Sequence, residues 1–383
     1  MKKLTFLMLH LNYGGLEKQT VTLINELAKN KKYEIEIVSV YDLLNGKSFY
    51  EIDNKVKITF LSKSGPNHKA IYEAKKNKKL FKLLKETINA LISLKYKYVD
   101  LKKYIRKAKT DVIVSTRIEF AKMIKRRDTI NISQEHSYIN NEKYINKVRK
   151  SFNNINYVVV MTEKAKNDYN KWLDTYNNYS KVVNIPNMID IKTEKKSDLN
   201  SNQIISVGRL EEEKDFISLI KMFDILYKKN NKLKLKIVGD GKQRKELEEL
   251  VNKLNLQENV IFTGRLEQQQ VENEILNSDL FVLTSYKESF SLVLVEAMSL
   301  GVPCVCFDIE VGPREIISNG VNGYLINGRN VVDMANKVEE LLKNKQELEK
   351  MANNSLCMSE KYRPEKIIKL WEGIFGDNIE TKE

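Results

Sequence analysis

Short apolar runs alternate with amphipathic stretches along the whole chain. The runs have the length of strands, and the stretches between them repeat apolar positions at helical spacing, which is typical of parallel sheets covered by helices. This pattern predicts an α/β protein with two doubly wound lobes. The strands expected in the first lobe are 4–11, 34–40, 56–61, 111–115, 129–133 and 157–161, and those in the second are 204–207, 233–238, 260–263, 280–284, 303–307 and 323–326.

The division between the lobes is predicted from a change in composition. Residues 191–202 are polar and lack apolar periodicity, so we interpret them as a linker between a first domain, 1–190, and a second, 203–360. The remaining segment, 361–383, contains the apolar side chains Ile367, Leu370, Trp371 and Phe375. We expect it to form a helix that packs back on the first domain.

Composition restricts the class of protein. The chain has 383 residues, of which 42% are hydrophobic and 30% charged, as in an ordinary soluble protein. Three cysteines and three histidines are too few for a disulfide framework or a zinc site, so we expect a reducing, cytoplasmic location. The chain has no Walker loop, zinc-ligand spacing or Asp-x-Asp element, so no bound metal or other cofactor is expected. The apolar start of the chain lacks a signal-peptide cleavage pattern, and no run reaches about 18 apolar residues, so a membrane span is not expected.

The positive charge is concentrated in the first lobe. Residues 1–200 carry 40 Lys and Arg against 21 Asp and Glu (+19), whereas residues 201–383 carry 25 against 30 (−5). A basic lobe indicates an anionic partner such as membrane lipid, nucleic acid or a polyanionic polymer.

Residues 69–109 are the most basic part of this lobe. Apolar residues recur there at helical spacing among many lysines, which predicts a basic amphipathic helix. Either its apolar face covers the sheet and its lysines are merely solvated, or the helix lies on an anionic lipid surface.

Two carboxylates near 290 provide the strongest chemical signal. Glu288 follows the predicted strand 280–284, in the position where ligands bind to open α/β sheets, and Glu296 lies within an apolar helical run. A carboxylate buried at 296 needs hydrogen-bond donors, which sugar hydroxyls supply. The backbone N–H groups of Ser291 and Leu292 would face an anion such as a diphosphate. Alternatively, Glu288 stabilises the helix dipole and Glu296 lies at the surface.

A second candidate follows the strand 204–207. Arg209 lies at its end and Lys214 opens the next helix, so both cations could contact one pair of phosphates. Alternatively, Lys214 only balances the acidic residues 211–213.

Three weaker signals accompany these candidates. Gly14 and Gly15 follow the first strand, where glycines let backbone approach a phosphate closely. Gly239 lies in a Gly-Asp-Gly fragment that lacks the third glycine of a dinucleotide-binding fingerprint. His136 follows a predicted strand end and could place a hydrogen-bonding group in the cleft between the lobes, although a lone histidine is more often structural.

Taken together, these residues resemble the retaining glycosyltransferases of the two-lobed GT-B architecture, specifically family 4. The resemblance spans the chain and is strongest from 204 to 326, where the family's motifs occur in its order. They are VGRL at 207–210 with Lys214, VGDG at 238–241, the segment 288–296, GVP at 301–303 with GPREII at 312–317, and NGVNG at 319–323.

The resemblance implies a role for each matching residue. Arg209 and Lys214 would hold the donor diphosphate, Glu296 the ribose, and Glu288 with the backbone after it the donor sugar. FTGRL at 262–266 resembles the base-contacting loop, and Ser289 and Ser291 replace glycines of many members. The implied catalytic residues are Glu288, His136, Arg209 and Lys214, and the implied nucleotide-sugar ligands are Gly14, Gly15, Arg209, Lys214, Gly239, Leu266, Glu288, Ser289, Phe290, Ser291, Leu292 and Glu296.

The implied activity is metal-independent transfer of a hexose or N-acetylhexosamine, with UDP favoured as the carrier, to a bacterial surface glycan: a lipid-linked oligosaccharide, capsule or wall polymer. The basic lobe favours a peripheral position on the inner face of the cell membrane. Three alternatives stay open, namely a non-catalytic relative that supports a partner transferase, a protein-glycosylating transferase and, from charge alone, a nucleic-acid-binding protein.

Overall fold

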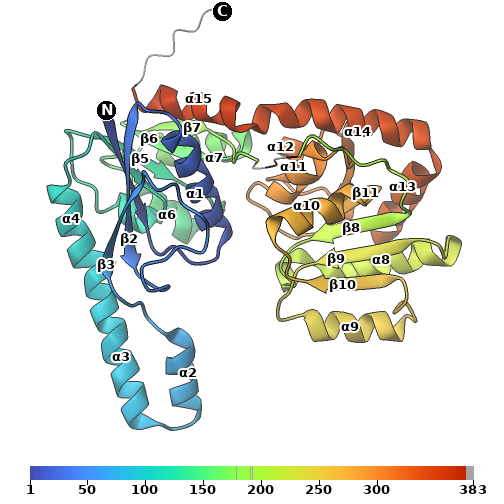
Figure 1. Cartoon of the computed structure of the whole chain (residues 1–383), viewed down its shortest axis with the longest axis horizontal. Coiled ribbons are helices and arrows are strands. Elements are labelled where there is room, and N and C mark those ends of the chain that lie inside the picture. Colours follow the sequence, from blue (N-terminus) through green and yellow to red (C-terminus); the bar gives the residue numbers. More distant parts are fainter. Residues whose placement is uncertain (178, 190, 192, 377–383) are drawn as a thin grey trace, which may run out of the picture. The chain divides into compact units, whose positions relative to one another are not determined.

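The chain forms two compact units (Figure 1). The computed structural model describes residues 1–376 except 178, 190 and 192. Unit 1 comprises Met1–Met188 and the chain from Ile367 onward, and unit 2 comprises Ile189–Lys366. None of the helices in this described part is long and apolar enough to cross a membrane.

Unit 1 is built on a parallel sheet with the strand order β3-β2-β1-β4-β5-β6-β7. All six runs predicted in the first lobe are strands of this sheet. The seventh, β7, was not predicted, because its four residues lie at an edge of the sheet and offer too short a pattern. The strands are β1 Lys2–Met8, β2 Tyr33–Tyr41, β3 Lys57–Ser62, β4 Val112–Ser115, β5 Ile130–Gln134, β6 Tyr157–Val160 and β7 Lys181–Asn184.

Both faces of this sheet are buried, which explains why its strands read as continuous apolar runs. Successive side chains of β1 point to opposite faces. Leu4 and Phe6 join a core that includes residues of α1 (Gly15–Ala28) and α15 (Pro364–Ile374). Leu7 joins a second core with residues of α4 (Leu101–Lys107), α5 (Ile118–Ala121) and α7 (Glu163–Leu173). The helices of unit 1 are α1 Gly15–Ala28, α2 His68–Lys76, α3 Leu80–Lys95, the π-helical turn η1 Tyr96–Asp100, α4 Leu101–Lys107, α5 Ile118–Ala121, α6 Glu142–Arg149 and α7 Glu163–Leu173.

Unit 2 repeats the design with a parallel sheet in the order β10-β9-β8-β11-β12-β13. All six predicted runs are again strands. They are β8 Gln203–Val207, β9 Lys234–Val238, β10 Val260–Gly264, β11 Leu280–Leu283, β12 Cys304–Phe307 and β13 Gly323–Ile326. The helical segments of unit 2 are η2 Glu212–Lys214, α8 Phe216–Lys229, α9 Arg244–Lys253, α10 Gln268–Leu276, α11 Leu292–Ser299, α12 Pro313–Ile316, η3 Asn327–Arg329, α13 Val331–Lys343, α14 Lys345–Ser359 and η4 Glu360–Tyr362, and α15 Pro364–Ile374 begins in it.

The polar segment 191–202 is attached to unit 2 through its described residues. Leu199 is buried in the core of that unit, and the Ser197 hydroxyl donates to the Ser278 carbonyl at 2.8 Å. The segment is held to unit 2 mostly by polar side chains, so its composition resembles that of a linker.

The end of α15 packs on unit 1. Trp371 and Phe375 are buried in the core beside β1, and the Lys2 ammonium donates to the Phe375 carbonyl at 2.9 Å. The Asn30 amide also donates to the Glu372 carboxylate at 2.9 Å. Residues 377–383 of the predicted segment 361–383 lie outside the described residues.

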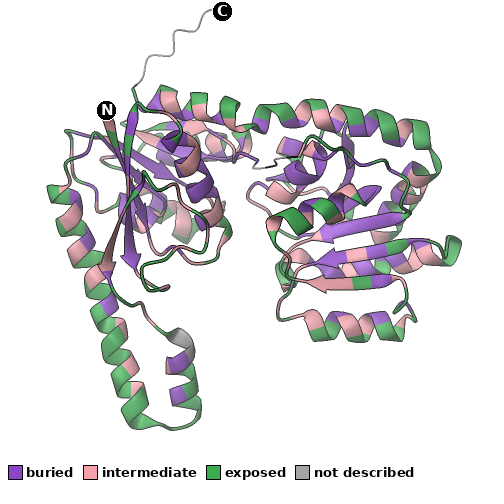
Figure 2. Ribbon diagram, viewed as in Figure 1, coloured by how far each residue is buried: buried purple, intermediate pink, exposed green. Residues whose placement is uncertain are grey.

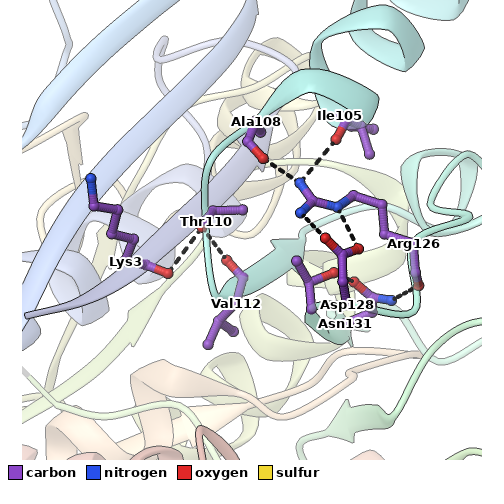
Figure 3. Close-up of polar contacts among 9 residues, drawn as sticks. Lys3, Ile105, Ala108, Thr110, Val112, Arg126, Asp128 and Asn131 are labelled. Carbon is purple, nitrogen blue, oxygen red and sulfur yellow. Dashed lines mark hydrogen bonds and ion pairs between the residues drawn. The ribbon is translucent and has the colours of Figure 1, made fainter.

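The helices α2 and α3 form a hairpin that extends from unit 1 (Figure 1), and α3 continues through η1 into α4. Arg126 holds the C-terminal end of α4: its guanidinium donates to the Ala108 carbonyl and pairs with Asp128 through Nε at 3.0 Å (Figure 3). Nearby, the Thr110 hydroxyl donates to the Lys3 carbonyl at 2.9 Å. The base of the hairpin is therefore fixed to the sheet.

Candidate functional site

The strand order of unit 2 reverses between β8 and β11. The chain passes outward from β8 through β9 to β10, returns to β11 on the other side of β8, and continues to β12 and β13. Loops that leave β8 and β11 therefore diverge at their carboxyl ends, which is where open α/β sheets bind ligands. The segments after these two strands carry Arg209, Lys214 and Glu288.

Lys214 and Glu288 meet at this point. Lys214 Nζ lies 2.6 Å from Glu288 Oε1, and the Ser285 hydroxyl donates to the same oxygen at 2.7 Å. The side chains are 20% and 9% exposed, so the pair is shielded from water on most sides. Lys214 is thus paired across the reversal point with Glu288 and not with the acidic residues 211–213.

The backbone around this pair is braced by Arg329. Its guanidinium pairs with Asp215, which follows Lys214, and donates from Nη1 to the Ser285 carbonyl at 2.8 Å. The guanidinium also lies over the Tyr286 ring, 3.8 Å from its centroid. One side chain therefore joins the segment that carries Lys214 to the segment that carries Glu288.

Two glycines make room for these segments. A Cβ at Gly239 would lie 1.9 Å from the Gly208 carbonyl oxygen, so only glycine lets β9 end against the loop after β8. At Gly312, where φ is +89°, a Cβ would lie 2.9 Å from the Glu288 Cβ. Gly239 is therefore required by packing between two protein segments, in addition to any part it has in binding.

The first turn of α11 lies after β11, the strand beside the reversal point. Its N-cap residue, Ser291, has a left-handed backbone (φ 73°), and its buried hydroxyl has no hydrogen-bond partner among the described residues. Phe290 packs edge-to-face on Tyr362 with centroids 5.5 Å apart. Ser289 and Leu292 are half-buried on either side. The Ser291 hydroxyl is therefore an unsatisfied polar group at the start of α11, whereas the Phe290 ring is engaged in packing.

Glu296 is buried within α11 at 7% exposure. The Gln268 amide lies between two carboxylates, 3.4 Å from Glu296 Oε1 and 3.1 Å from Glu272 Oε1. Gln268 opens α10 directly after the loop that contains Leu266, which is half-buried. The expectation of a surface position for Glu296 is wrong, because it lies in the buried part of α11, from Leu294 to Met298.

Arg209 lies at the rim of this site. Its guanidinium is 62% exposed and pairs with Glu213 at 2.9 Å. An exposed ion pair of this kind contributes little to stability and opens readily. Arg209 and Lys214 are therefore attached to one loop, but in this structure they do not share a partner.

Unit 1 has an equivalent reversal between β1 and β4, and polar side chains gather there too. Gly14 and Gly15 lie at the start of α1, and Glu17 in its first turn is 4% exposed. Glu17 Oε1 lies 3.5 Å from His10 Nδ1 and 3.7 Å from the Arg117 guanidinium. This buried oxygen has no hydrogen bond among the described residues, so a donor supplied from outside would stabilise it.

His136 follows β5, the next strand of the sheet. Its Nε2 is buried and without a partner in the described part of the chain. Burial, aided by the positive charge of Arg117, lowers the pKa of His136 to about 4, so the imidazole is neutral at pH 7. Burial also lowers the pKa of His10, with Arg117 acting in the same sense.

Glu135, beside His136, has the opposite shift. Burial raises its pKa to about 7, although the Ser133 and Tyr144 hydroxyls donate to its carboxylate at 2.8 and 3.0 Å. Neighbouring residues thus place a neutral histidine and a partly protonated acid at one strand end.

Three residues with defined contacts at these reversal points were not predicted. Glu17 resembles any acid in the first turn of a helix, and Arg117 and Arg329 belong to no local motif. Only the fold brings them to their partners. A prediction of the strand order would have placed Arg117 beside the Gly14 loop.

Comparison with known proteins gives a consistent picture. The family model described as "Glycosyl transferases group 1" matches residues 187–356, which is less than half of the chain. An uncharacterized glycosyltransferase of Haemophilus influenzae is 28% identical over 98% of this chain and 100% of its own length. A Campylobacter jejuni enzyme named as an N-acetyl-D-galactosaminyltransferase acting on a diphosphoundecaprenol-linked glycan is 26% identical over 93% of each chain.

Among solved structures, the S. aureus protein TarM superposes on this chain with a TM-score of 0.76 at 18% sequence identity. The match covers 98% of this chain and 100% of the TarM chain. That structure is a G117R mutant in complex with Fondaparinux, alpha-GlcNAc-glycerol and UDP. The chain has the GT-B fold. The predicted fold class is therefore confirmed, and the family match and relatives support a glycosyltransferase built on it.

The two glycines of the GT-B chain's first loop should respond differently to alanine. A Cβ at Gly14 would lie 2.1 Å from Glu17 Oε2, whereas a Cβ at Gly15 meets nothing within 4 Å. We expect Gly14→Ala to displace the buried carboxylate and to lower the free energy of unfolding by about 1 to 3 kcal/mol. Gly15→Ala, in a helix, should be neutral or slightly stabilising. Equal losses in denaturant unfolding of the two variants would contradict this geometry.

His136 should make stability depend on pH on the acidic side. Its pKa is about 4 in the folded chain against an ordinary 6.5, so only the unfolded chain takes up this proton between those values. Wild-type stability should therefore fall, relative to His136→Gln, by up to about 1.4 kcal/mol per unit as the pH is lowered from 6.5 to 4. Glu135, with its raised pKa, changes stability with pH in the opposite direction. Because both proteins contain Glu135, its effect cancels in the difference between their free energies of unfolding. Parallel stability curves for the two proteins would exclude the shift.

Proposed function

We propose that the protein is a retaining glycosyltransferase of family 4. It moves a hexose or N-acetylhexosamine from a UDP-sugar to a bacterial surface-glycan acceptor, by a reaction that needs no metal. The observation that carries the proposal is the half-buried Lys214–Glu288 pair, whose charged atoms are 2.6 Å apart at the strand-order reversal of unit 2, with Glu288 a few residues before α11 begins.

This arrangement suits a diphosphate leaving group. In the reaction the bond from the anomeric carbon to the diphosphate oxygen breaks, a bond to the acceptor oxygen forms, and the acceptor's proton leaves with the nucleoside diphosphate. Negative charge grows on the leaving oxygens while the sugar becomes positive. Lys214 and the N–H groups after Ser291 would stabilise the leaving oxygens, and Arg209 would turn from Glu213 to join them.

The same loops offer groups for the rest of the donor. Glu288 would accept hydrogen bonds from the donor sugar, since Lys214 and Ser285 hold its carboxylate in place. Glu296 would accept from the ribose hydroxyls, with Gln268 holding its carboxylate. Leu266 and Gly239 would border the base and the diphosphate.

Unit 1 is proposed to contribute the acceptor side. Gly14 and Gly15 would lie beside the diphosphate and the acceptor, and the neutral His136 near the sugar. The excess of basic residues favours an anionic or lipid-linked acceptor. The Campylobacter relative, whose name specifies a lipid-linked glycan, supports this class. We place the protein in the cytoplasm, peripheral to the inner face of the cell membrane.

Binding of the nucleotide is the simplest test. Thermal unfolding with UDP, GDP or ADP identifies the carrier, because a ligand at about 100 times its dissociation constant adds roughly 2.7 kcal/mol to stability. The bound UDP in the TarM complex supports UDP. No shift with any of the three nucleotides would favour a non-catalytic GT-B protein that supports a partner enzyme.

Arg209→Ala should lower turnover of the donor about a hundredfold to a thousandfold, because the transition state loses one oriented cation. The variant should stay folded, since its ion pair is exposed. Lys221→Ala, which removes an exposed lysine from α8, is the matched control and should keep wild-type turnover. Release of UDP from UDP-glucose and UDP-N-acetylglucosamine measures both, with and without EDTA. Near-normal turnover of Arg209→Ala would remove Arg209 from the mechanism.

A further inference from the structure

The hairpin of α2 and α3 carries a row of exposed apolar side chains. Leu80 and Phe81 at its tip are 77% and 92% exposed, and further apolar residues of α3 are exposed as well. Most of α3 is coloured as exposed in Figure 2. Spacings of three and four residues place these side chains on one helix face. We call this face the apolar stripe; its members are Leu80, Phe81, Leu84, Ile88, Leu91 and Ile92.

The sheet is not what covers this stripe. The opposite side of α3 makes the contacts within unit 1: Ser93 is buried, and its carbonyl accepts a hydrogen bond from the Tyr41 hydroxyl at 3.1 Å. Ala70 and Ala74 of α2 are buried, and α2 packs against α3. The expectation that the apolar face covers the sheet is therefore wrong for the stripe, and an exposed apolar surface of this kind indicates a binding partner.

The tip of the hairpin is also strongly basic. Residues 70–85 contain six lysines and one acidic residue, Glu73, which gives a net charge of +5. We call these lysines the basic tip; they are Lys75, Lys76, Lys78, Lys79, Lys82 and Lys85, and all are exposed.

We propose that the hairpin docks on an anionic lipid bilayer, with Leu80 and Phe81 entering the boundary between headgroups and acyl chains and the basic tip on the lipid phosphates. The basic tip and the apolar stripe lie together on the hairpin, and this combination favours a lipid bilayer over other anionic partners. Nucleic acid would leave the aliphatic stripe uncovered, and a second copy of the chain would bring two basic tips together. A bilayer surface covers apolar side chains and neutralises lysines at once.

The hairpin is suited to this role because its base is fixed. The Tyr41–Ser93 hydrogen bond and the contacts of Arg126 hold α3 and α4 to the sheet, so the stripe is presented by an ordered helix. The inference deepens the peripheral membrane position of the proposed function by naming the surface that makes it. It does not depend on the transfer reaction, because no residue of the hairpin belongs to the donor site.

Sedimentation of the full chain with vesicles tests the electrostatic part. At about 50 mM salt, the wild type should partition to phosphatidylglycerol–phosphatidylcholine vesicles and not to pure phosphatidylcholine. The quadruple variant Lys75→Gln, Lys76→Gln, Lys78→Gln, Lys79→Gln should lose about a hundredfold to a thousandfold in partition. A charge-matched control, Lys232→Gln, Lys253→Gln, Lys345→Gln, Lys350→Gln, removes four exposed lysines of unit 2 and should lose much less. Equal losses in the two variants, or equal binding to both vesicle types, would overturn the proposal.

A second pair of variants tests insertion. Leu80→Ser with Phe81→Ser should reduce partition at least about tenfold, whereas Val332→Ser, at an exposed apolar site of unit 2, should not. Phe81→Trp should give a blue-shifted emission on anionic vesicles only, since both native tryptophans are buried. An unshifted emission on vesicles that bind the protein would exclude insertion.

Two further measurements separate the other outcomes. Light scattering without lipid would overturn the proposal if the wild type is an oligomer that Leu80→Ser with Phe81→Ser dissociates, because the stripe would then be an interface between copies. The UDP-dependent thermal shift should be the same in all of these variants. If the wild type shows the UDP-dependent shift but does not bind anionic vesicles, the lipid inference alone is refuted. If it binds the vesicles but shows no shift, the donor site alone is refuted.

Discussion

The reversal of strand order beside β8 is the constraint on which the rest of unit 2 depends. Parallel strands place all their carboxyl ends at one edge, and the reversal lets two of the loops at that edge diverge. Lys214 and Glu288 occupy these loops and pair across the gap at 2.6 Å. A carboxylate shielded from water on most sides needs such a partner, so the pair holds the two loops together.

Other features of unit 2 follow from holding this pair in place. Arg329 ties the two segments together, and Gly239 and Gly312 remove the side chains that would push them apart. Unit 1 uses the same topology differently. Its reversal gathers His10, Glu17 and Arg117 around the Gly14 loop, and burial after the end of β5 keeps His136 neutral.

The sequence predicted the sheets well because strands buried on both faces are continuous apolar runs, and only the short edge strand β7 was missed. It predicted the positions of Lys214, Glu288 and Glu296 relative to strands and helices, since each follows a local pattern. The sequence could not predict which side chains these residues contact. Lys214 pairs with Glu288 and not with its acidic neighbours, and Gln268 reaches Glu296, because these contacts arise only when separate strands come together. The exposure of the stripe on α3 was equally hidden, since helical periodicity does not reveal what covers a face.

The central claim is that Lys214, held by Glu288, binds the diphosphate of the donor. Calorimetric titration of UDP and of uridine into the wild type and Lys214→Gln tests it most directly, because uridine shares everything but the phosphates. The account predicts that the wild type binds UDP much more tightly than uridine. In Lys214→Gln the ratio of the uridine to the UDP dissociation constant should fall at least about tenfold, while the affinity for uridine stays unchanged. An unchanged ratio of dissociation constants in Lys214→Gln would contradict the claim.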